Sequence, residues 1–416
     1  MTLAPTRPGS AWPDLQVVPG GARTAVSARV ARGLFTAAVD RLPVTVHLED
    51  AERSVLGLGG PAMTVHRPDE LFARLGRDGL IGFGEAYLTG AWDARDLTGF
   101  LTVLAANVGD LVPQSLQRLR RLVLRGTPRR HRPTQEHTRE LIAHHYDLSN
   151  ELFRLFLDES LSYSSALFDG TDDLHEAQHR KIDRLLDAAG VGPGTRVLEI
   201  GTGWGELAIR AAARGATVRS ITLSTEQQAL ARERIAAAGC SDRVAVDLCD
   251  YRAVSTGPAA GETYDAVLSV EMVEAVGWEY WSEYFRTLDR VLAPGGRVGI
   301  QAILMPHDRM LATRGSYTWI NKYIFPGGFL PSAEVIDQVT ARDTGLRVVD
   351  RLAFGRDYAE TLRRWDEAFL DRRDEVLALG FDETFLRMWH FYLCYSRAGF
   401  AAGYLDVQQL TLARES

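Results

Sequence analysis

The stretch that decides the fold class is "VLEIGTGWGELAIRAA", residues 197–212. A short apolar segment leads into a loop that carries Gly201, Gly203 and Gly205, and a helical pattern follows the loop. Glycines in such a loop let a ligand approach the backbone closely. The loop alone favours a dinucleotide and a methyl donor equally, with a purely structural turn as the third interpretation.

The surrounding sequence repeats the alternation of strand and helix. Between residue 134 and about residue 305, helical patterns alternate with the strand-like runs "RVLEI", "TVRSITL", "RVAVDL", "YDAVLSV" and "RVGIQAI". This alternation predicts an α/β fold: a Rossmann-like, mostly parallel sheet with helices on both faces. The pattern of residues 306–416 is mostly helical and aromatic.

A chain of 416 residues is longer than one hydrophobic core usually holds, so we expect more than one domain. Upstream of the α/β region, "VTVHLED" and "AMTVHRP" predict short strands, and a helix–glycine turn–helix pattern follows them. The predicted divisions are a flexible tail (1–22), a small N-terminal α+β domain (23–112), a basic linker helix that ends at Pro133 (113–133) and the Rossmann-like domain (134–416).

Composition excludes several classes of protein. The formal net charge of −7 argues against a general nucleic-acid binder. Cys240, Cys249 and Cys394 lack the spacing of metal ligands, so we expect neither a metal site nor a disulfide framework. The sequence has no run of 18 apolar residues and begins without a signal-peptide core, so we expect a cytoplasmic protein that does not span a membrane.

The residues after the second predicted strand separate the candidate ligands. A dinucleotide site needs an acidic residue there for the ribose, whereas "ITLSTEQQ" (221–228) offers Thr222, Ser224 and Gln227. No Gly-Lys-Ser/Thr follows the glycine loop, which excludes a P-loop. S-adenosylmethionine remains: its amino-acid part fits over the glycine loop after Glu199. In "CDYRAV", Asp250 can accept a hydrogen bond from the adenine amino group and Tyr251 can pack on the ring, although Asp250 alone could equally be a turn residue.

At this point the chain resembles the cyclopropane-fatty-acyl-phospholipid synthase family, which includes synthases of the tuberculostearate type. The resemblance is carried by "AHHYDLSNELFRLFLDESLSYSSALF", "VLEIGTGWG", "ITLSTEQQ", "DYRAV", "SVEMVEAVG", "WINKYIFPGGFLPS" and "GRDYAETLRRW", which follow in family order. "GFGEAYLTGAWDARDLTGFL" resembles the N-terminal domain of the phospholipid-acting members. The resemblance implies transfer of a one-carbon unit from S-adenosylmethionine to a cis double bond of a phospholipid acyl chain, with bicarbonate as the base. It makes 23–112 a lipid-associated accessory domain and 134–416 a methyltransferase domain with helical insertions that cover the acyl chain.

The resemblance also implies site residues. Glu274 matches the family's bicarbonate-holding glutamate, and Tyr358 matches the tyrosine that donates its hydroxyl to the ion. Ser165 stands where the family has cysteine, and Gln301 and Ala275 stand where it has histidine; Gln301 can still donate an N–H to the ion, and residue 165 can contribute its backbone N–H. Tyr146 is the remaining catalytic candidate. The expected cofactor-binding residues are Tyr163, Ser164, Glu199, Gly201, Gly203, Thr222, Leu223, Ser224, Gln227, Asp250 and Tyr251.

The chemistry adds two expectations about the substrate side. A carbocation forms in mid-chain, and aromatic faces can stabilise it; besides Tyr146, the candidates are Phe153, Phe156, Tyr163, Trp319, Tyr323 and Phe325. Arginines cluster between residues 118 and 132, where they could contact an anionic membrane surface peripherally or simply form a solvated linker. Self-association as a homodimer rests on the resemblance alone.

Three functions stay open at the level of sequence. A lipid-modifying methyltransferase could close a cyclopropane ring, or could shift a hydride and release a mid-chain methylene. A methyltransferase acting on a soluble small molecule is the second class, and a non-catalytic lipid or adenosine-ligand sensor is the third. Retention of Glu274 and Tyr358 argues against the sensor.

Overall fold

The computed structural model describes residues 12–49, 54–107, 149–255 and 261–415, and these form two compact units. The larger unit holds residues 149–255, 261–314, 325–361 and 405–415, and the smaller unit holds residues 12–49, 54–107, 315–324 and 362–404. The predicted linker helix (113–133), its arginine cluster and Tyr146 lie outside the described residues.

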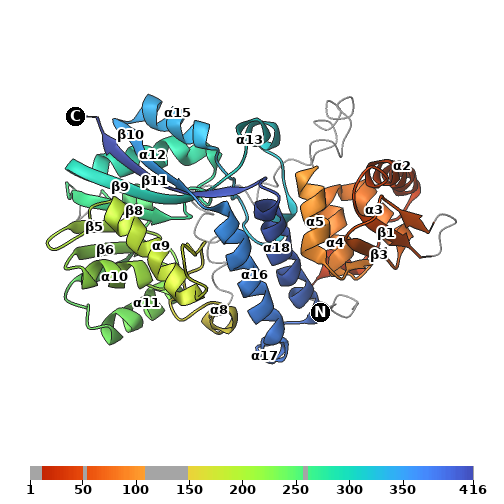
Figure 1. The fold of residues 1–416 in the computed structure, drawn as a ribbon, viewed down its shortest axis with the longest axis horizontal. Helices are drawn as coiled ribbons and strands as arrows, with labels where there is room; N and C mark the ends of the chain where they lie inside the picture. Colours follow the sequence, from red (N-terminus) through yellow and green to blue (C-terminus); the bar gives the residue numbers. More distant parts are fainter. Residues whose placement is uncertain (1–11, 50–53, 108–148, 256–260, 416) are drawn as a thin grey trace. The chain divides into compact units, whose positions relative to one another are not determined.

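The larger unit is built on a seven-stranded sheet with the order β10-β11-β9-β8-β5-β6-β7 (Figure 1). Strands β5 to β9 run parallel, whereas β11 is antiparallel to both of its neighbours, β9 and β10. Its strands are β5 (Arg196–Ile200), β6 (Thr217–Thr222), β7 (Val244–Leu248), β8 (Tyr264–Val270), β9 (Leu292–Leu304), β10 (Leu346–Ala353) and β11 (Asp406–Arg414). Its helices are α8 (Asn150–Phe156), α9 (Leu174–Ala188), α10 (Glu206–Ala213), α11 (Thr225–Ala237), η2 (Tyr251–Ala253), η4 (Trp278–Tyr280), α12 (Trp281–Val291), α13 (His307–Thr313), α15 (Ala333–Asp343) and the start of α16 (Gly355–Asp371).

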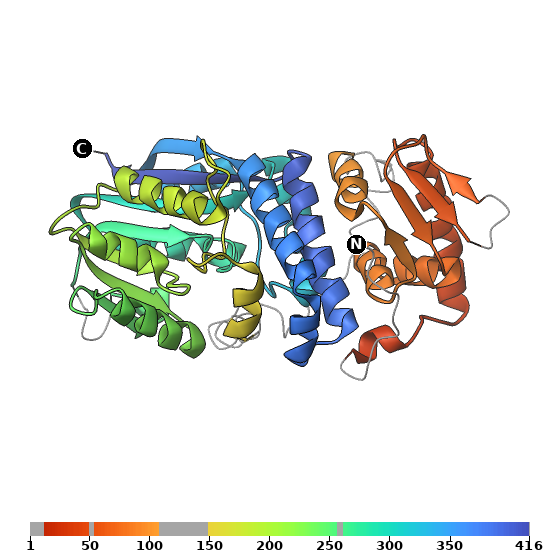
Figure 2. The same ribbon diagram turned by 60° about the horizontal axis from the view of Figure 1, so that its bottom comes forward.

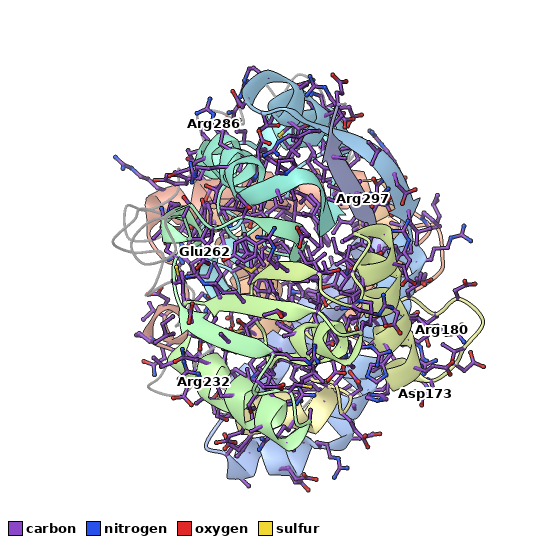
Figure 3. All side chains as sticks on the ribbon, turned by 90° about the vertical axis from the view of Figure 1, so that its left-hand side faces the viewer. Asp173, Arg180, Arg232, Glu262, Arg286 and Arg297 are labelled. Atoms are coloured by element: carbon purple, nitrogen blue, oxygen red, sulfur yellow. The ribbon has the colours of Figure 1, made fainter. Side chains whose placement is uncertain are left out.

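Helices cover both faces of this sheet because its strands are apolar on both sides. Val197 and Leu198, neighbours in β5, are both fully buried and belong to the hydrophobic cores of opposite faces. Helices α9, α10 and α11 supply the core on one face, and α12 and α15 supply the core on the other (Figures 1 and 2). The charged sides of these helices point outward, as Arg232 on α11 and Arg286 on α12 do in Figure 3.

The predicted fold class is confirmed, and so are the five strand-like runs, which form β5 to β9. The structure adds β10 and β11 in the region for which the sequence pattern predicts mostly helices. Both strands extend the parallel part of the sheet at the β9 edge, and β11 inserts between β9 and β10 although it follows β10 by more than fifty residues in the chain.

The smaller unit contains a four-stranded sheet with the order β2-β1-β3-β4 and a set of helices around it. The predicted strands "VTVHLED" and "AMTVHRP" correspond to β1 and β3. Buried Arg387 donates to Asp93 Oδ1 at 2.7 Å, which anchors α18 to β4. The elements are α1 (Pro13–Gln16), α2 (Ala22–Val39), β1 (Thr45–Leu48), β2 (Val55–Leu56), β3 (Ala62–Val65), α3 (Pro68–Asp78), α4 (Leu80–Leu88), β4 (Trp92–Ala94), α5 (Leu97–Ala106), α14 (Trp319–Tyr323), the end of α16, α17 (Arg373–Ala378) and α18 (Glu383–Ala401).

The two units divide the chain differently from the predicted domains. Residues 315–324 and 362–404 group with the N-terminal residues rather than with the rest of 134–416. Two aromatic candidates therefore belong to the smaller unit: Trp319, and Tyr323, whose hydroxyl donates to Glu85 Oε1 at 3.0 Å. Among the described residues, no helix has the length and hydropathy needed to cross a bilayer.

Candidate functional site

One cavity in the larger unit lies where β5, β6 and β8 end. The ends of parallel strands in an open α/β sheet are the usual place for a ligand. Ten of the eleven expected cofactor-binding residues line this cavity, namely Tyr163, Ser164, Glu199, Gly201, Gly203, Thr222, Leu223, Gln227, Asp250 and Tyr251. Ser224 is absent from the lining; its hydroxyl accepts a hydrogen bond from Gln227 N and caps the start of α11.

The glycine loop adopts backbone conformations that favour glycine. The φ angles are 97° at Gly201, 52° at Gly203 and 92° at Gly205, and these positive values are costly for residues with a Cβ. A Cβ at Gly201 would meet the side chain of Met272 at 2.7 Å, whereas a Cβ at Gly203 would meet nothing within 4 Å. Gly203 lines the cavity and has open space at its missing Cβ, so a ligand can approach this part of the backbone closely.

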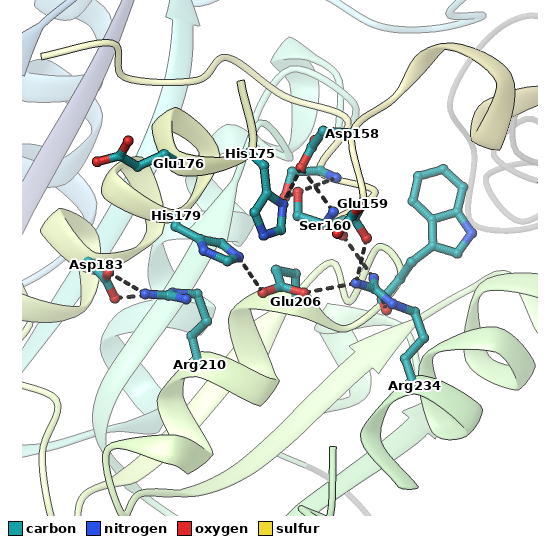
Figure 4. A network of polar contacts seen from close by, with 12 residues as sticks. Asp158, Glu159, Ser160, His175, Glu176, His179, Asp183, Glu206, Arg210 and Arg234 are labelled. Atoms are coloured by element: carbon teal, nitrogen blue, oxygen red, sulfur yellow. Dashed lines mark hydrogen bonds and ion pairs between the residues drawn. The ribbon is translucent and has the colours of Figure 1, made fainter. Parts of the chain in front are cut away.

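Polar contacts hold the segment before α9 against the cavity (Figure 4). Glu206, at the start of α10, accepts from Arg234 Nη2 at 2.8 Å and lies 2.9 Å from His179 Nε2. Arg234 also donates to the carbonyl oxygen of Ser160 at 2.8 Å, and Asp158 accepts from Ser160 N at 2.9 Å. This network fixes residues 158–160, and residues 161–164, which follow them, line the cavity together with the glycine loop.

Aromatic rings gather beside the glycine loop. The ring centroids of Phe153 and Trp204 are 4.9 Å apart, and those of Phe153 and Tyr163 are 5.1 Å apart. Trp204 Nε1 donates to Asn150 Oδ1 at 2.8 Å, which ties α8 to the loop. Tyr163 and Trp204 line the cavity, and the buried rings of Phe153 and Phe156 pack next to them, so this side of the site is aromatic and apolar.

Asp250 and Tyr251 line the cavity just after β7 ends. Asp250 accepts three hydrogen bonds from Arg252: from its backbone N at 2.9 Å, from Nε at 2.8 Å and from Nη2 at 2.5 Å. Burial raises the pKa of Asp250, but the hydrogen bonds from Arg252 outweigh it and hold that pKa below its ordinary value. Asp250 therefore stays a carboxylate, an acceptor suited to an amino group.

Glu199 is buried in β5, just before the glycine loop, where it accepts from Ser220 Oγ at 2.5 Å. Burial raises the pKa of Glu199 to about 8, because the charged form is poorly solvated there. The folded protein therefore holds a proton on Glu199 that the unfolded chain releases near pH 4.5.

A prediction about stability follows from this shift. Between pH 4.5 and 8 the folded state binds the extra proton, so the contribution of Glu199 to stability falls as the pH rises. We expect Glu199→Gln, which keeps a neutral side chain, to become more stable relative to the wild type across this range, by at most ~1.4 kcal/mol per pH unit. Urea denaturation at several pH values without cofactor measures the difference. A constant difference from pH 5 to 8 would contradict it.

The three residues expected around the catalytic base do converge, but on Glu271. Ser165 N donates to Glu271 Oε1 at 2.9 Å, and Gln301 Nε2 donates to the same oxygen at 2.9 Å. The hydroxyl of Tyr358 donates to Glu271 Oε2 at 2.7 Å. Gln301 is held in this orientation because its own carbonyl oxygen accepts from Gln409 Nε2 at 3.1 Å.

Glu274 lies next to this cluster with far fewer donors. Its Oε1 accepts from Ile303 N at 2.5 Å, and its buried Oε2 has no hydrogen-bond partner among the described residues. Burial, together with the nearby charge of Glu271, raises the pKa of Glu274 to about 8. Glu274 therefore holds a proton at neutral pH.

The site does not fit bicarbonate in the way that the resemblance implies. The donors of Ser165, Gln301 and Tyr358 already satisfy the Glu271 carboxylate. A second anion beside Glu271 would lack these donors and would face a like charge. We therefore derive no step through bicarbonate.

Two further residues of the site were missed in the sequence. Lys181 is buried in α9, lines the cavity and donates to Ser164 Oγ at 2.6 Å; burial lowers its pKa to about 8. Glu271 lines the cavity as well. The signal for Glu271 was present in "SVEMVEAVG", where two carboxylates stand three residues apart immediately after a buried strand.

Residues 133–410 match the family model described as mycolic acid cyclopropane synthetase. The chain is 53% identical over 415 residues to the tuberculostearic acid methyltransferase UfaA1 of Mycobacterium tuberculosis. The aligned region covers 97% of this chain and 95% of the relative. It is 32% identical over 367 residues to the cyclopropane-fatty-acyl-phospholipid synthase of Escherichia coli strain K12, covering 87% and 91% of the two chains.

Two solved structures are similar to the larger part of the chain. The cyclopropane synthase MmaA2 from Mycobacterium tuberculosis superposes with a TM-score of 0.60 at 31% identity, over 66% of this chain and 98% of its own. The mycolic acid cyclopropane synthase CmaA1, complexed with SAH and CTAB, gives a TM-score of 0.60 at 30% identity, over 66% of this chain and 97% of its own.

Proposed function

The chain belongs to the mycolic acid cyclopropane synthetase family, and from this premise we propose that it places a one-carbon unit on a cis double bond of a phospholipid acyl chain and releases a mid-chain methylene product. At a coarser level it is an S-adenosylmethionine-dependent methyltransferase that acts on fatty acids. The substrate and product are the parts that need testing.

One observation carries the choice of product. The relative named for tuberculostearic acid is 53% identical over nearly the whole chain, whereas the relative named for cyclopropane is 32% identical over less of it. Tuberculostearic acid carries a methyl branch in mid-chain, and a mid-chain methylene is the precursor of such a branch. The methylene product is therefore favoured over the cyclopropane.

The reaction needs an alkene aligned with the sulfonium methyl, a site that excludes water, and a base. The alkene attacks the sulfonium methyl: a carbon–carbon bond forms, the sulfur–methyl bond breaks, and a carbocation remains on the neighbouring carbon. A hydride then shifts to that carbon, and a base removes a proton from the added methyl to leave the methylene. The cavity holds the methyl donor over the glycine loop, and the aromatic rings of Tyr163 and Trp204, which line it with buried Phe153 packed against them, help exclude water that would trap the cation.

Fatty-acid analysis tests the product. We expect cells that express the protein and are fed oleate to accumulate a methylene-branched acid, one carbon heavier than oleate and separable from the cyclopropane isomer by gas chromatography with mass detection. A pure cyclopropane product would assign the protein to the other branch of the family's chemistry. If the purified enzyme ignored phospholipid vesicles and methylated a soluble compound, the lipid proposal would be wrong.

We also propose that the enzyme visits an anionic membrane surface peripherally, at the inner face of the membrane. The arginine cluster between residues 118 and 132 supports this, since each basic residue near an anionic surface is worth ~1 kcal/mol. We expect reversal of Arg120, Arg121, Arg129 and Arg130 to glutamate to weaken binding to vesicles that contain phosphatidylglycerol at least several-fold at low salt, without changing donor affinity. Co-sedimentation measures this; equal binding of both proteins at low salt would leave the cluster as a linker only.

A further inference from the structure

We propose that the carboxylate of Glu271 is the catalytic base, which removes the proton from the transferred methyl group in the place that the resemblance gave to bicarbonate. This inference rests on the proposed function, because it names the group that completes that reaction. It also makes the enzyme independent of an exogenous base.

The first support is the set of donors around Glu271. They come from separate parts of the chain: the segment before α9 supplies Ser165 N, β9 supplies Gln301, and α16 supplies Tyr358. Both carboxylate oxygens are oriented, one by two donors and one by the tyrosine hydroxyl. Such an arrangement holds an anion in a fixed position, which is what a base that must meet one particular methyl group requires.

The second support is the backbone of Glu271. Its φ is 53°, in the left-handed region that residues with a Cβ rarely adopt. Strain of this kind persists where the surrounding structure imposes it, and it gathers at functional sites. Here Glu271 N donates to Gln301 O at 2.8 Å, so the turn that follows β8 is fixed and the side chain is directed into the cluster of donors.

The third support is position and charge. Glu271 lines the cavity that takes the methyl donor, whereas Glu274 does not. Burial raises the pKa of Glu271 above its ordinary value, which makes it a stronger base than an exposed carboxylate, while its three hydrogen bonds and nearby Lys181 act in the opposite direction and favour the ionised form. Glu274, which accepts from Ile303 N and whose other oxygen has no partner in the part of the chain that the structure describes, holds the proton of this pair.

The proton balance is complete without another reagent. The sulfonium enters with one positive charge, and methyl transfer moves this charge to the acyl chain as a carbocation. A hydride shift then places the cation on the carbon that carries the added methyl. When Glu271 takes a proton from that methyl, the electron pair of the broken carbon–hydrogen bond forms the second, π bond of the carbon–carbon double bond and neutralises the cation. The carboxyl group then returns its proton to solvent after the product leaves.

Two variants of Glu271 test the inference together with the wild type. We expect wild-type turnover on oleoyl phospholipid to be the same in buffer stripped of bicarbonate and in buffer with bicarbonate added. Glu271→Gln should lower turnover ~100-fold or more in both buffers, because an amide cannot take the proton, while its affinity for S-adenosylmethionine stays within a few-fold of the wild type. Glu274→Gln is the matched control: an amide resembles the protonated carboxyl, so we expect a loss at least ten-fold smaller than that of Glu271→Gln.

Glu271→Gly should create the bicarbonate site that the wild type lacks. This change frees the three donors and relieves the positive φ. We expect added sodium bicarbonate to raise its turnover at least ~10-fold and to leave Glu271→Gln unaffected, since the glutamine still fills the space.

Calorimetry keeps this inference separate from the proposed function. Titration of bicarbonate into enzyme saturated with S-adenosylhomocysteine needs no substrate, and we expect binding by Glu271→Gly and none by the wild type. Wild-type turnover that stops when bicarbonate is stripped, bicarbonate binding to the wild type, or near-normal turnover of Glu271→Gln would each overturn the inference. A wild type without turnover on any unsaturated lipid would overturn the proposed function instead, and the calorimetric result would still decide the role of the site.

Discussion

Gly203→Val is expected to lower the affinity for S-adenosylmethionine at least ~100-fold, the cost of ~3 kcal/mol of lost contact or added clash. Gly203 lines the cavity, and its missing side chain faces space that no protein atom fills within 4 Å. A valine there would project into the volume that the amino-acid part of the donor needs. Isothermal titration calorimetry with S-adenosylhomocysteine measures the loss.

The chain offers a matched control for this substitution. Gly203 has a φ of 52°, so valine also strains the backbone, by roughly 1–2 kcal/mol. Gly239, after α11, has a φ of 68°, equally open space around its missing Cβ and no place in the cavity lining. Gly239→Val should therefore lose similar stability and keep its affinity for the donor. Equal donor affinity in Gly203→Val and the wild type would show that the donor does not lie over this loop.

The central sheet could be predicted because its signals are local. Each of the strands β5 to β9 is an apolar run beside a helical pattern, and glycines mark the loop where β5 ends. Strands β10 and β11 were missed because their partners are remote: β11 pairs with β9, which ends about a hundred residues earlier in the chain. The composition of "LRVVDRLA" does not show whether such a partner exists.

The catalytic cluster shows the same limit of prediction from the sequence. The resemblance pointed to Ser165, Gln301 and Tyr358, and the structure brings their hydrogen-bond donors together. The sequence offered two carboxylates in one motif, Glu271 and Glu274, and the resemblance pointed to the second. Which of the two receives the donors depends on the turn after β8, where the positive φ of Glu271 sets the direction of its side chain. No local pattern encodes that choice.

Tyr358→Phe is expected to reduce turnover by ~10- to 100-fold, because a hydrogen bond to a charged group contributes about 1.5–3 kcal/mol. The tyrosine hydroxyl donates to Glu271 Oε2 at 2.7 Å, and phenylalanine leaves the ring in place while removing this donor. The affinity for S-adenosylmethionine should change little. Steady-state kinetics on oleoyl phospholipid and calorimetry with S-adenosylhomocysteine separate the two effects.

A pH–rate profile distinguishes a role in catalysis from one in folding. The hydroxyl of Tyr358 lowers the pKa of Glu271, as do the amide of Gln301 on β9 and the charge of Lys181 on α9, while Glu274 is the acidic group beside it. Without the hydroxyl the pKa of Glu271 rises, so the acidic limb of the profile should move to higher pH. Tyr264→Phe is the control, since it removes a hydroxyl that donates to Glu262 at the opposite end of β8. If both variants kept the wild-type profile, Tyr358 would not act through the ionisation of Glu271, and the base would have to be sought elsewhere in the cavity.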